Sequence, residues 1–186
     1  MIKLFFLILV FFSVFTEAAD ISKTKLQEIR TLYYSSVENE EDLERLENML
    51  IGMFPENVKR PGIITAYMAA AEAVKGKHAF WPITKLGYLR SAMDSLESVI
   101  KIYPDDLEIR FIRFSILHHL PKILGYSSET KEDAAVILDL LKNHKFGLLD
   151  NKIVIGIAEF IYRSGRISDE NKNELVSLFP GMKTDE

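Results

Sequence analysis

Two arginines in an apolar segment are the side chains best placed for charge recognition. Arg110 and Arg113 lie three positions apart within 107–120, where most other side chains are apolar. A helix that is apolar most of the way round is expected in a protein interior, where an unpaired charge is costly. The guanidinium groups therefore pair with carboxylates of this chain or with a carboxylate of a partner. The internal candidates are Asp94, Glu97 and Glu72. We favour internal pairing, because structural ion-pair networks are common.

The only tryptophan lies among residues that could recognise a ligand. Close to Trp81 in sequence are His78, Phe80, Lys85 and Tyr88. Such a group could form the edge of an aromatic pocket with one cation, suited to a peptide, a carboxylate or a sugar. The alternative, which we favour, is that Trp81 and Phe80 pack onto neighbouring helices, because large aromatic side chains dominate core energetics. The candidate partner-binding residues are Trp81, Lys85, Tyr88, Arg110 and Arg113.

No motif of the sequence predicts catalysis, a metal or a cofactor. His118 and His119 are adjacent, so on a helix their side chains point about 100° apart and do not face one metal. Neither a His-x-x-x-His pair nor a Gly-x-Ser-x-Gly turn occurs, and glycine-rich phosphate loops are absent. We therefore predict a protein that is not an enzyme and that binds no cofactor or metal.

Composition excludes several further classes of partner and structure. The 186 residues include no cysteine, so neither a disulfide nor a thiolate metal site can form. A formal net charge of −4 provides no positive field to attract nucleic acid. With 48% hydrophobic and 27% charged residues, the chain can bury a sizeable core as one domain.

The first residues have the form of an export signal. Lys3 precedes an apolar run over 4–15, which Ser13 alone interrupts, and Ala18 follows shortly after it. The run is shorter than the ~20 residues that a membrane-spanning helix needs. We predict cleavage after Ala18, with a retained anchor as the alternative. The expected products are a signal peptide (1–18) and a single domain (19–186), exported from a bacterial cell to the periplasm or beyond, with no stable membrane insertion.

Helical signals dominate the rest of the chain, and we predict eight helices. The third is predicted from Pro61 to Gly76 and is rich in alanine, which allows a neighbouring helix to approach closely. A connection of twelve residues, from Gly76 to Gly87, is expected before a fourth helix that starts near Tyr88 and ends near Tyr103. Only 151–157 could form a strand, and its helical neighbours favour a helix.

Several helix starts carry capping residues. Asn39 with Asp42 is predicted to cap the second helix, and Asp105 with Glu108 the fifth. Ser127 or Ser128 is expected to cap the sixth helix, and Ser168 the eighth.

Two of the predicted helices share one pattern of side chains. Ala92, Leu96 and Val99 are followed by Pro104, and the same small–large spacing recurs 42 positions later. The members of the second set are Ala134, Leu138 and Leu141. This pattern resembles the second helix of a tetratricopeptide repeat, in which small residues lie where helices touch and a proline ends the helix. The stretch 81–113 also resembles exported bacterial proteins with degenerate repeats of this kind.

The resemblance implies an all-α fold, with antiparallel helix pairs stacked as a short α–α superhelix. The first hypothesis for the function is a scaffold for protein–protein interaction, whose partner is another exported or envelope protein or peptide. On that hypothesis, Tyr67, Arg110 and Arg113 line an exposed groove. The alternative hypothesis is a protein that binds a small ligand or solute in a pocket near Trp81.

Overall fold

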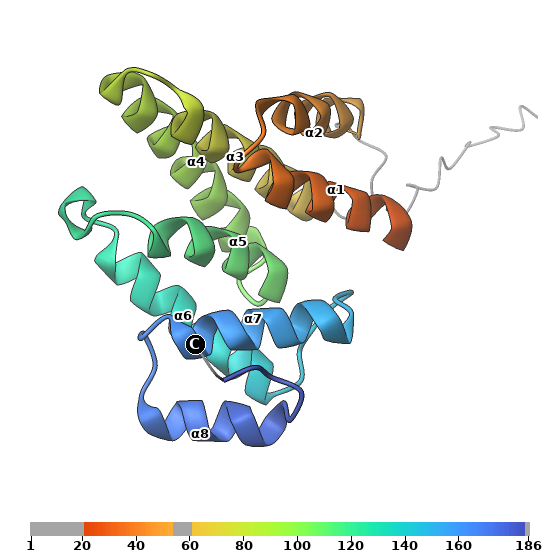
Figure 1. Cartoon of the computed structure of the whole chain (residues 1–186), viewed down its shortest axis with the longest axis vertical. Coiled ribbons are helices and arrows are strands. Elements are labelled where there is room, and N and C mark those ends of the chain that lie inside the picture. Colours follow the sequence, from red (N-terminus) through yellow and green to blue (C-terminus); the bar gives the residue numbers. More distant parts are fainter. Residues whose placement is uncertain (1–20, 54–60, 185–186) are drawn as a thin grey trace, which may run out of the picture.

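The protein is built from α-helices. The computed structural model describes residues 21–53 and 61–184, and the part of the chain so described contains eight α-helices and no strand (Figure 1). The predicted all-α fold is therefore confirmed, and the ambiguous segment 151–157 is helical. The predicted signal peptide lies outside the described residues.

The helices pack mainly against their neighbours along the chain. Their bounds are α1 (Lys23–Ser36), α2 (Glu40–Met53), α3 (Pro61–His78), α4 (Pro82–Ile102), α5 (Leu107–His118), α6 (Ser127–Lys142), α7 (Asn151–Arg163) and α8 (Asp169–Leu178), with a 3₁₀ turn, η1 (Lys122–Leu124), after α5. Packed adjacent pairs of this kind are compatible with a helical-repeat fold. Among the described residues, no helix combines the length and the apolar character needed to cross a membrane.

Short polar side chains cap the N-terminal ends of several helices, as their sequence positions suggest. Asn39 accepts a hydrogen bond from the Glu41 N–H at the start of α2, and Ser168 caps α8. The predicted cap of α5 was wrong by one residue, because Asp106 accepts the bonds from the N–H groups of Glu108 and Ile109. The serine cap of α6 was also wrong, since Tyr126 occupies the N-cap position without a side-chain bond.

The α3–α4 pair is longer than its sequence predicted. Pro82 is the first residue of α4, a position where proline's missing N–H costs nothing, so only 79–81 separate the two helices. The predicted connection from Gly76 to Gly87 was therefore wrong. Gly76 is buried inside α3, and a Cβ placed on it would lie 3.2 Å from the Lys85 carbonyl oxygen. The two helices thus approach closely where a glycine permits it.

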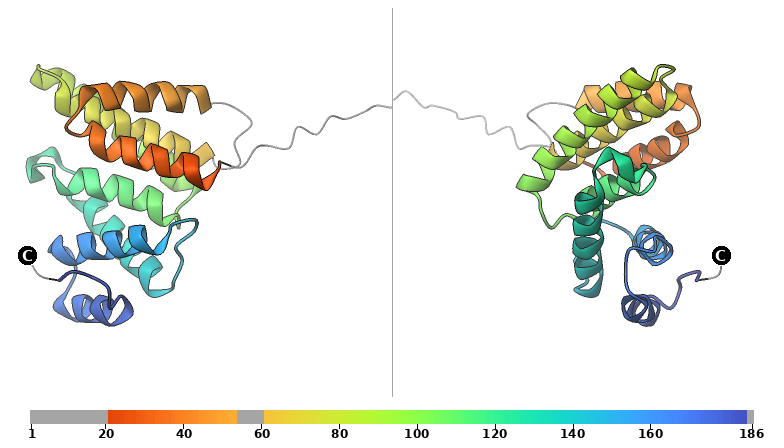
Figure 2. Two further views of the ribbon diagram at one scale, coloured as in Figure 1. Left: turned by 45° about the vertical axis from the view of Figure 1, so that its right-hand side comes forward. Right: turned by 90° about the vertical axis from the view of Figure 1, so that its left-hand side faces the viewer.

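Helix α5 lies between two hydrophobic cores. Every residue from Leu107 to Phe114 is buried. Ile109, Ile112 and Leu117 pack with α1–α4, whereas the second core joins other α5 side chains to α6–α8. The repeated alanine–leucine patterns of α4 and α6 are buried in the first and second core, respectively. The central position that was predicted for this segment is confirmed, and Figure 2 shows α5 between the two groups of helices.

Candidate functional site

A closed ionic network ties α5 to α1 and α3. The Arg30 Nε and Nη2 atoms donate to the two carboxylate oxygens of Glu108 at 2.7 and 2.8 Å, and the Tyr67 hydroxyl donates to Glu108 Oε1 at 2.8 Å. All three side chains are buried. Burial acts to lower the pKa of Arg30, but the hydrogen bonds and charge of Glu108 outweigh it and the pKa is raised. Burial and then the charge of Glu108 raise the pKa of Tyr67 well above its usual value.

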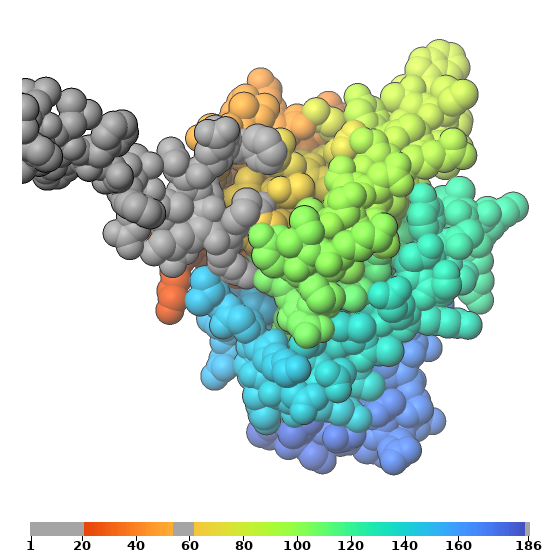
Figure 3. All heavy atoms as spheres, turned by 180° about the vertical axis from the view of Figure 1, so that it is seen from behind, coloured from red at the N-terminus to blue at the C-terminus, as the bar shows by residue number. Residues whose placement is uncertain are grey.

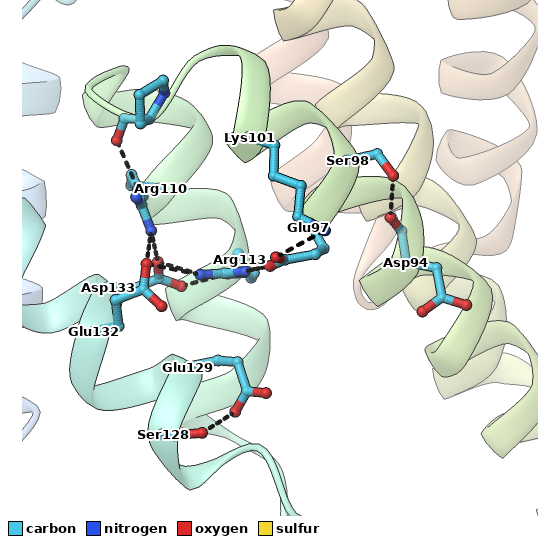
Figure 4. Close-up of polar contacts among 11 residues, drawn as sticks. Asp94, Glu97, Ser98, Lys101, Arg110, Arg113, Ser128, Glu129, Glu132 and Asp133 are labelled. Atoms are coloured by element: carbon cyan, nitrogen blue, oxygen red, sulfur yellow. Dashed lines mark hydrogen bonds and ion pairs between the residues drawn. The ribbon is translucent and has the colours of Figure 1, made fainter.

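A second network surrounds the two predicted arginines. Arg113 donates from Nε and Nη2 to both oxygens of Asp133, at 2.7 and 2.8 Å (Figure 4). Arg110 donates from Nη1 to Asp133 Oδ1 at 2.9 Å and from Nε to the Pro104 carbonyl oxygen at 2.7 Å. One fully buried carboxylate of α6 therefore holds two guanidinium groups of α5.

Two further carboxylates place this second network in contact with solvent. Glu132 accepts from Arg110 Nη1 at 2.7 Å, and Glu97 of α4 pairs with Arg113. Their side chains are 56% and 46% exposed. The hydrogen bond from Arg110 lowers the pKa of Glu132, against an opposing effect of burial. Burial acts to lower the pKa of Arg113, but the hydrogen bonds and charges of Asp133 and Glu97 raise it overall.

The arginines are therefore internal. Arg110 and Arg113 are only 5% and 2% exposed, so the internal pairing that we favoured is what the structure shows. Of the predicted partners, Glu97 is present in the network, whereas neither Asp94 nor Glu72 bonds to the arginines. The predicted exposed groove was wrong, because Tyr67 is also buried against Glu108.

The residues around Trp81 have the opposite environment. Phe80 and Trp81 are 83% and 66% exposed, and their rings meet edge to face with centroids 5.1 Å apart. The favoured interpretation of these two aromatics as core contacts was therefore wrong. Lys85 is exposed and its Nζ donates to the Lys77 carbonyl oxygen at 2.9 Å, while Tyr88 is half-buried. Trp81 and Tyr88 border a hollow of about 420 Å³ between α2 and the α3–α4 turn, but Lys85 does not line it.

An aromatic cleft, which sequence analysis missed, lies between α1, α5 and α7. Tyr33 and Tyr34 of α1, Phe111 of α5 and Phe160 of α7 line a volume of about 580 Å³. Figures 1 and 2 show α1 and α7 on opposite sides of α5. Gly156 of α7 also lines the cleft, and a Cβ placed on it would meet nothing within 4 Å. The backbone of α7 is therefore open to the cleft at Gly156.

The tyrosines of the cleft remain neutral at physiological pH. Burial raises the pKa of Tyr33 to about 12. Tyr34 is 60% exposed, and partial desolvation and the charge of Glu108 raise its pKa as well. A neutral phenol supplies an apolar ring with one hydroxyl that can donate or accept a hydrogen bond. The cleft can therefore hold an apolar side chain and bond to a backbone group beside it.

The histidine pair packs against aromatic rings. The rings of His118 and His119 lie 5.2 Å apart, and both contact Phe160. Burial lowers the pKa of His118, with smaller contributions from the charges of His119 and Arg166. Within 21–53 and 61–184, no group of three or more potential ligand side chains is arranged to hold a metal ion.

Comparison with known proteins leaves the family of this chain open. No family model, no curated protein and no solved structure matches it. Its function must therefore be inferred from the geometry of the described residues.

Proposed function

We propose that this chain is an exported, non-enzymatic scaffold of tetratricopeptide-like helix pairs that binds a segment of another protein. The binding site is the aromatic cleft between α1, α5 and α7. Export is supported by the form of residues 1–18 alone. The repeat-like character is supported by the two buried alanine–leucine patterns and by the packed helix pairs.

The observation that carries the proposal is the combination of aromatic walls with an open backbone. Aromatic side chains are enriched at the centres of protein interfaces because they bury a large area with few rotatable bonds. A volume of about 580 Å³ falls within the usual range for ligand sites. The absence of a side chain at Gly156 leaves room for a partner's backbone to approach α7.

The walls of the cleft are held in place before any partner arrives. The buried pair Arg30–Glu108 fixes α1 to α5. Phe160 of α7 packs edge to face on Phe111 and Phe114 of α5, with centroid distances of 5.3 and 5.8 Å. A preorganised site loses less conformational entropy on binding than a mobile one. This arrangement favours binding of an extended segment without a large rearrangement.

The lining of the cleft indicates what the segment carries. Asp150 and Lys152 line it together with the aromatic side chains, so its charges are of both signs. An apolar or aromatic anchor flanked by polar residues fits this arrangement better than a strongly charged segment.

Filling the cleft tests the proposal. Peptides would be selected from a random displayed library on the purified chain, and their affinities measured by fluorescence anisotropy. We expect Gly156→Leu to weaken binding at least tenfold, because the new side chain occupies the cleft while leucine is a better helix former than glycine. Gly87→Leu is the matched control, since Gly87 is also an exposed helical glycine with open space around it. Peptides that bind all three proteins equally, or failure to select any peptide, would refute the proposal.

A further inference from the structure

A further hollow lies beside the C-terminal end of α1. Its volume is about 660 Å³, and its walls come from α1, α3, α4, α5 and η1. The side chains that form most of these walls are aliphatic, and they include Val37, Val74, Leu86, Leu89, Ile116 and Leu120. We call this hollow the lysine-rimmed pocket, because Lys77 and Lys85 border it.

The two lysines of the rim differ in their partners. Lys77 bonds to the Glu38 carboxylate and to the Val37 carbonyl oxygen. Among residues 21–53 and 61–184, Lys85 donates to the Lys77 carbonyl oxygen and pairs with no carboxylate. Lys85 therefore brings to the apolar pocket a positive charge that no carboxylate of the described residues neutralises. An anionic group placed there would gain a charge-assisted hydrogen bond.

Two exposed apolar side chains are sequence neighbours of residues that line the pocket. Ile83 in the first turn of α4 is 82% exposed, and Ile123 in η1 is 92% exposed. The neighbours of these two residues, Pro82 and Leu124, line the pocket itself. Figure 3 shows that the α3–α4 end and the η1 segment project on the same side of the molecule. Large apolar side chains exposed around a concave apolar surface are typical of binding sites for apolar ligands.

We propose that the lysine-rimmed pocket binds an amphiphile with an acyl chain, whose anionic head pairs with Lys85. The aliphatic walls contact the acyl chain, the Lys85 ammonium donates a hydrogen bond to the anionic head, and Ile83 and Ile123 cover the part of the chain nearest the opening. The shared chemistry fits a free fatty acid or a lysophospholipid. The proposal does not depend on peptide binding in the aromatic cleft, although Tyr33, Val37 and His119 border both hollows.

Displacement of a fluorescent fatty acid tests this site on the purified chain. The probe is 11-(dansylamino)undecanoic acid, whose emission increases when it enters an apolar site. The competitors are laurate, palmitate, 1-hexadecanol and palmitoyl-lysophosphatidylglycerol. We expect palmitate to displace the probe. The affinity of 1-hexadecanol should be at least tenfold weaker than that of palmitate, because the alcohol carries no charge. Affinity should also increase from laurate to palmitate, by up to about fourfold for each buried methylene. Displacement by palmitate or by the lysophospholipid supports the site, and the stronger competitor identifies the source of the ligand.

Two lysine variants, one at the rim of the pocket and one away from its lining, test the role of the Lys85 charge. We expect Lys85→Gln to weaken palmitate binding about tenfold and to leave 1-hexadecanol binding unchanged. Lys131→Gln is the control, because Lys131 is an exposed lysine of α6 that does not line the pocket. Three outcomes would overturn the proposal: no probe binding, equal palmitate affinity in Lys85→Gln and the unmodified chain, or loss of probe binding in Gly156→Leu, which fills only the aromatic cleft.

Discussion

The two ionic networks of α5 differ in their access to water. The closed network joins Arg30, Glu108 and Tyr67, all of which are buried. In the open network, Asp133 is buried with Arg110 and Arg113, whereas Glu97 and Glu132 reach solvent. Both networks begin on the same helix, yet one is sealed between α1, α3 and α5 and the other extends to the surface.

The difference indicates how one helix is placed between two cores. The closed network fixes α5 against the first core, and the open network fixes it against α4 and α6. Buried ion pairs add little net stability, because desolvation offsets their attraction. Breaking one is costly, because a charge is then left buried without a partner. We therefore infer that these networks determine where α5 lies more than they increase the total stability.

The largest effect is expected from Asp133→Asn. This change removes the buried carboxylate to which both Arg110 and Arg113 donate, and leaves each arginine paired with one partly exposed glutamate. We expect a loss of about 3 to 5 kcal/mol in the free energy of unfolding, measured by urea denaturation with circular dichroism. The side chain keeps its size, so the loss reports on charge and not on a cavity.

Glu97→Gln is the comparison for that variant. It removes a carboxylate from the same network at a position that is 46% exposed, where water can replace it. We expect a loss below about 1 kcal/mol. Equal losses in the two variants would show that the open network is not divided into a buried centre and a solvated rim.

Breaking the closed network is expected to lower the free energy of unfolding by less than Asp133→Asn does. Replacing all of its polar groups by apolar ones should restore the stability. Glu108→Gln strands only Arg30, and we expect it to cost about 3 kcal/mol in the same urea assay. The combined variant Arg30→Met, Glu108→Leu, Tyr67→Phe removes every polar group of the network. Its stability should lie within about 1 kcal/mol of the unmodified chain. A combined variant as unstable as Glu108→Gln would mean that the ion pair itself is required for folding.

Local sequence patterns predicted much of this arrangement. The apolar segment around Arg110 and Arg113 correctly indicated a central helix and internal pairing, because those expectations depend on burial alone. Asp133 was missed, although it lies four residues before the buried Ile137 on the same face of α6. That spacing was a usable signal, since an acidic residue on an apolar face needs a partner.

Other features depend on contacts that no local pattern contains. Pro82 lies within the connection that was predicted from Gly76 to Gly87, yet it starts α4, because proline fits the first turn of a helix as well as a loop. Trp81 is exposed because it lies in the short turn 79–81 between α3 and α4, beyond the ends of both helices. The aromatic cleft brings together side chains from α1, α5 and α7, which are far apart in the sequence. The aromatic cleft and the lysine-rimmed pocket, which joins side chains of α1, α3, α4, α5 and η1, could therefore be found only from the tertiary structure.

The smallest effect is expected from Glu132→Gln, and it should depend on pH. The pKa of Glu132 is lowered in the folded protein by the hydrogen bond from Arg110. Its contribution is therefore present above the unfolded-state pKa of about 4.3 and is lost as pH falls through the folded-state pKa. We expect Glu132→Gln to be less stable by under about 1 kcal/mol at pH 6, since the side chain is 56% exposed, and the difference to disappear in strong acid. Urea midpoints of both proteins from pH 6 to pH 2 would measure this, with Glu44→Gln, a change at an exposed glutamate of α2, as the control. A difference that stays constant with pH would show that Glu132 acts by packing and not by charge.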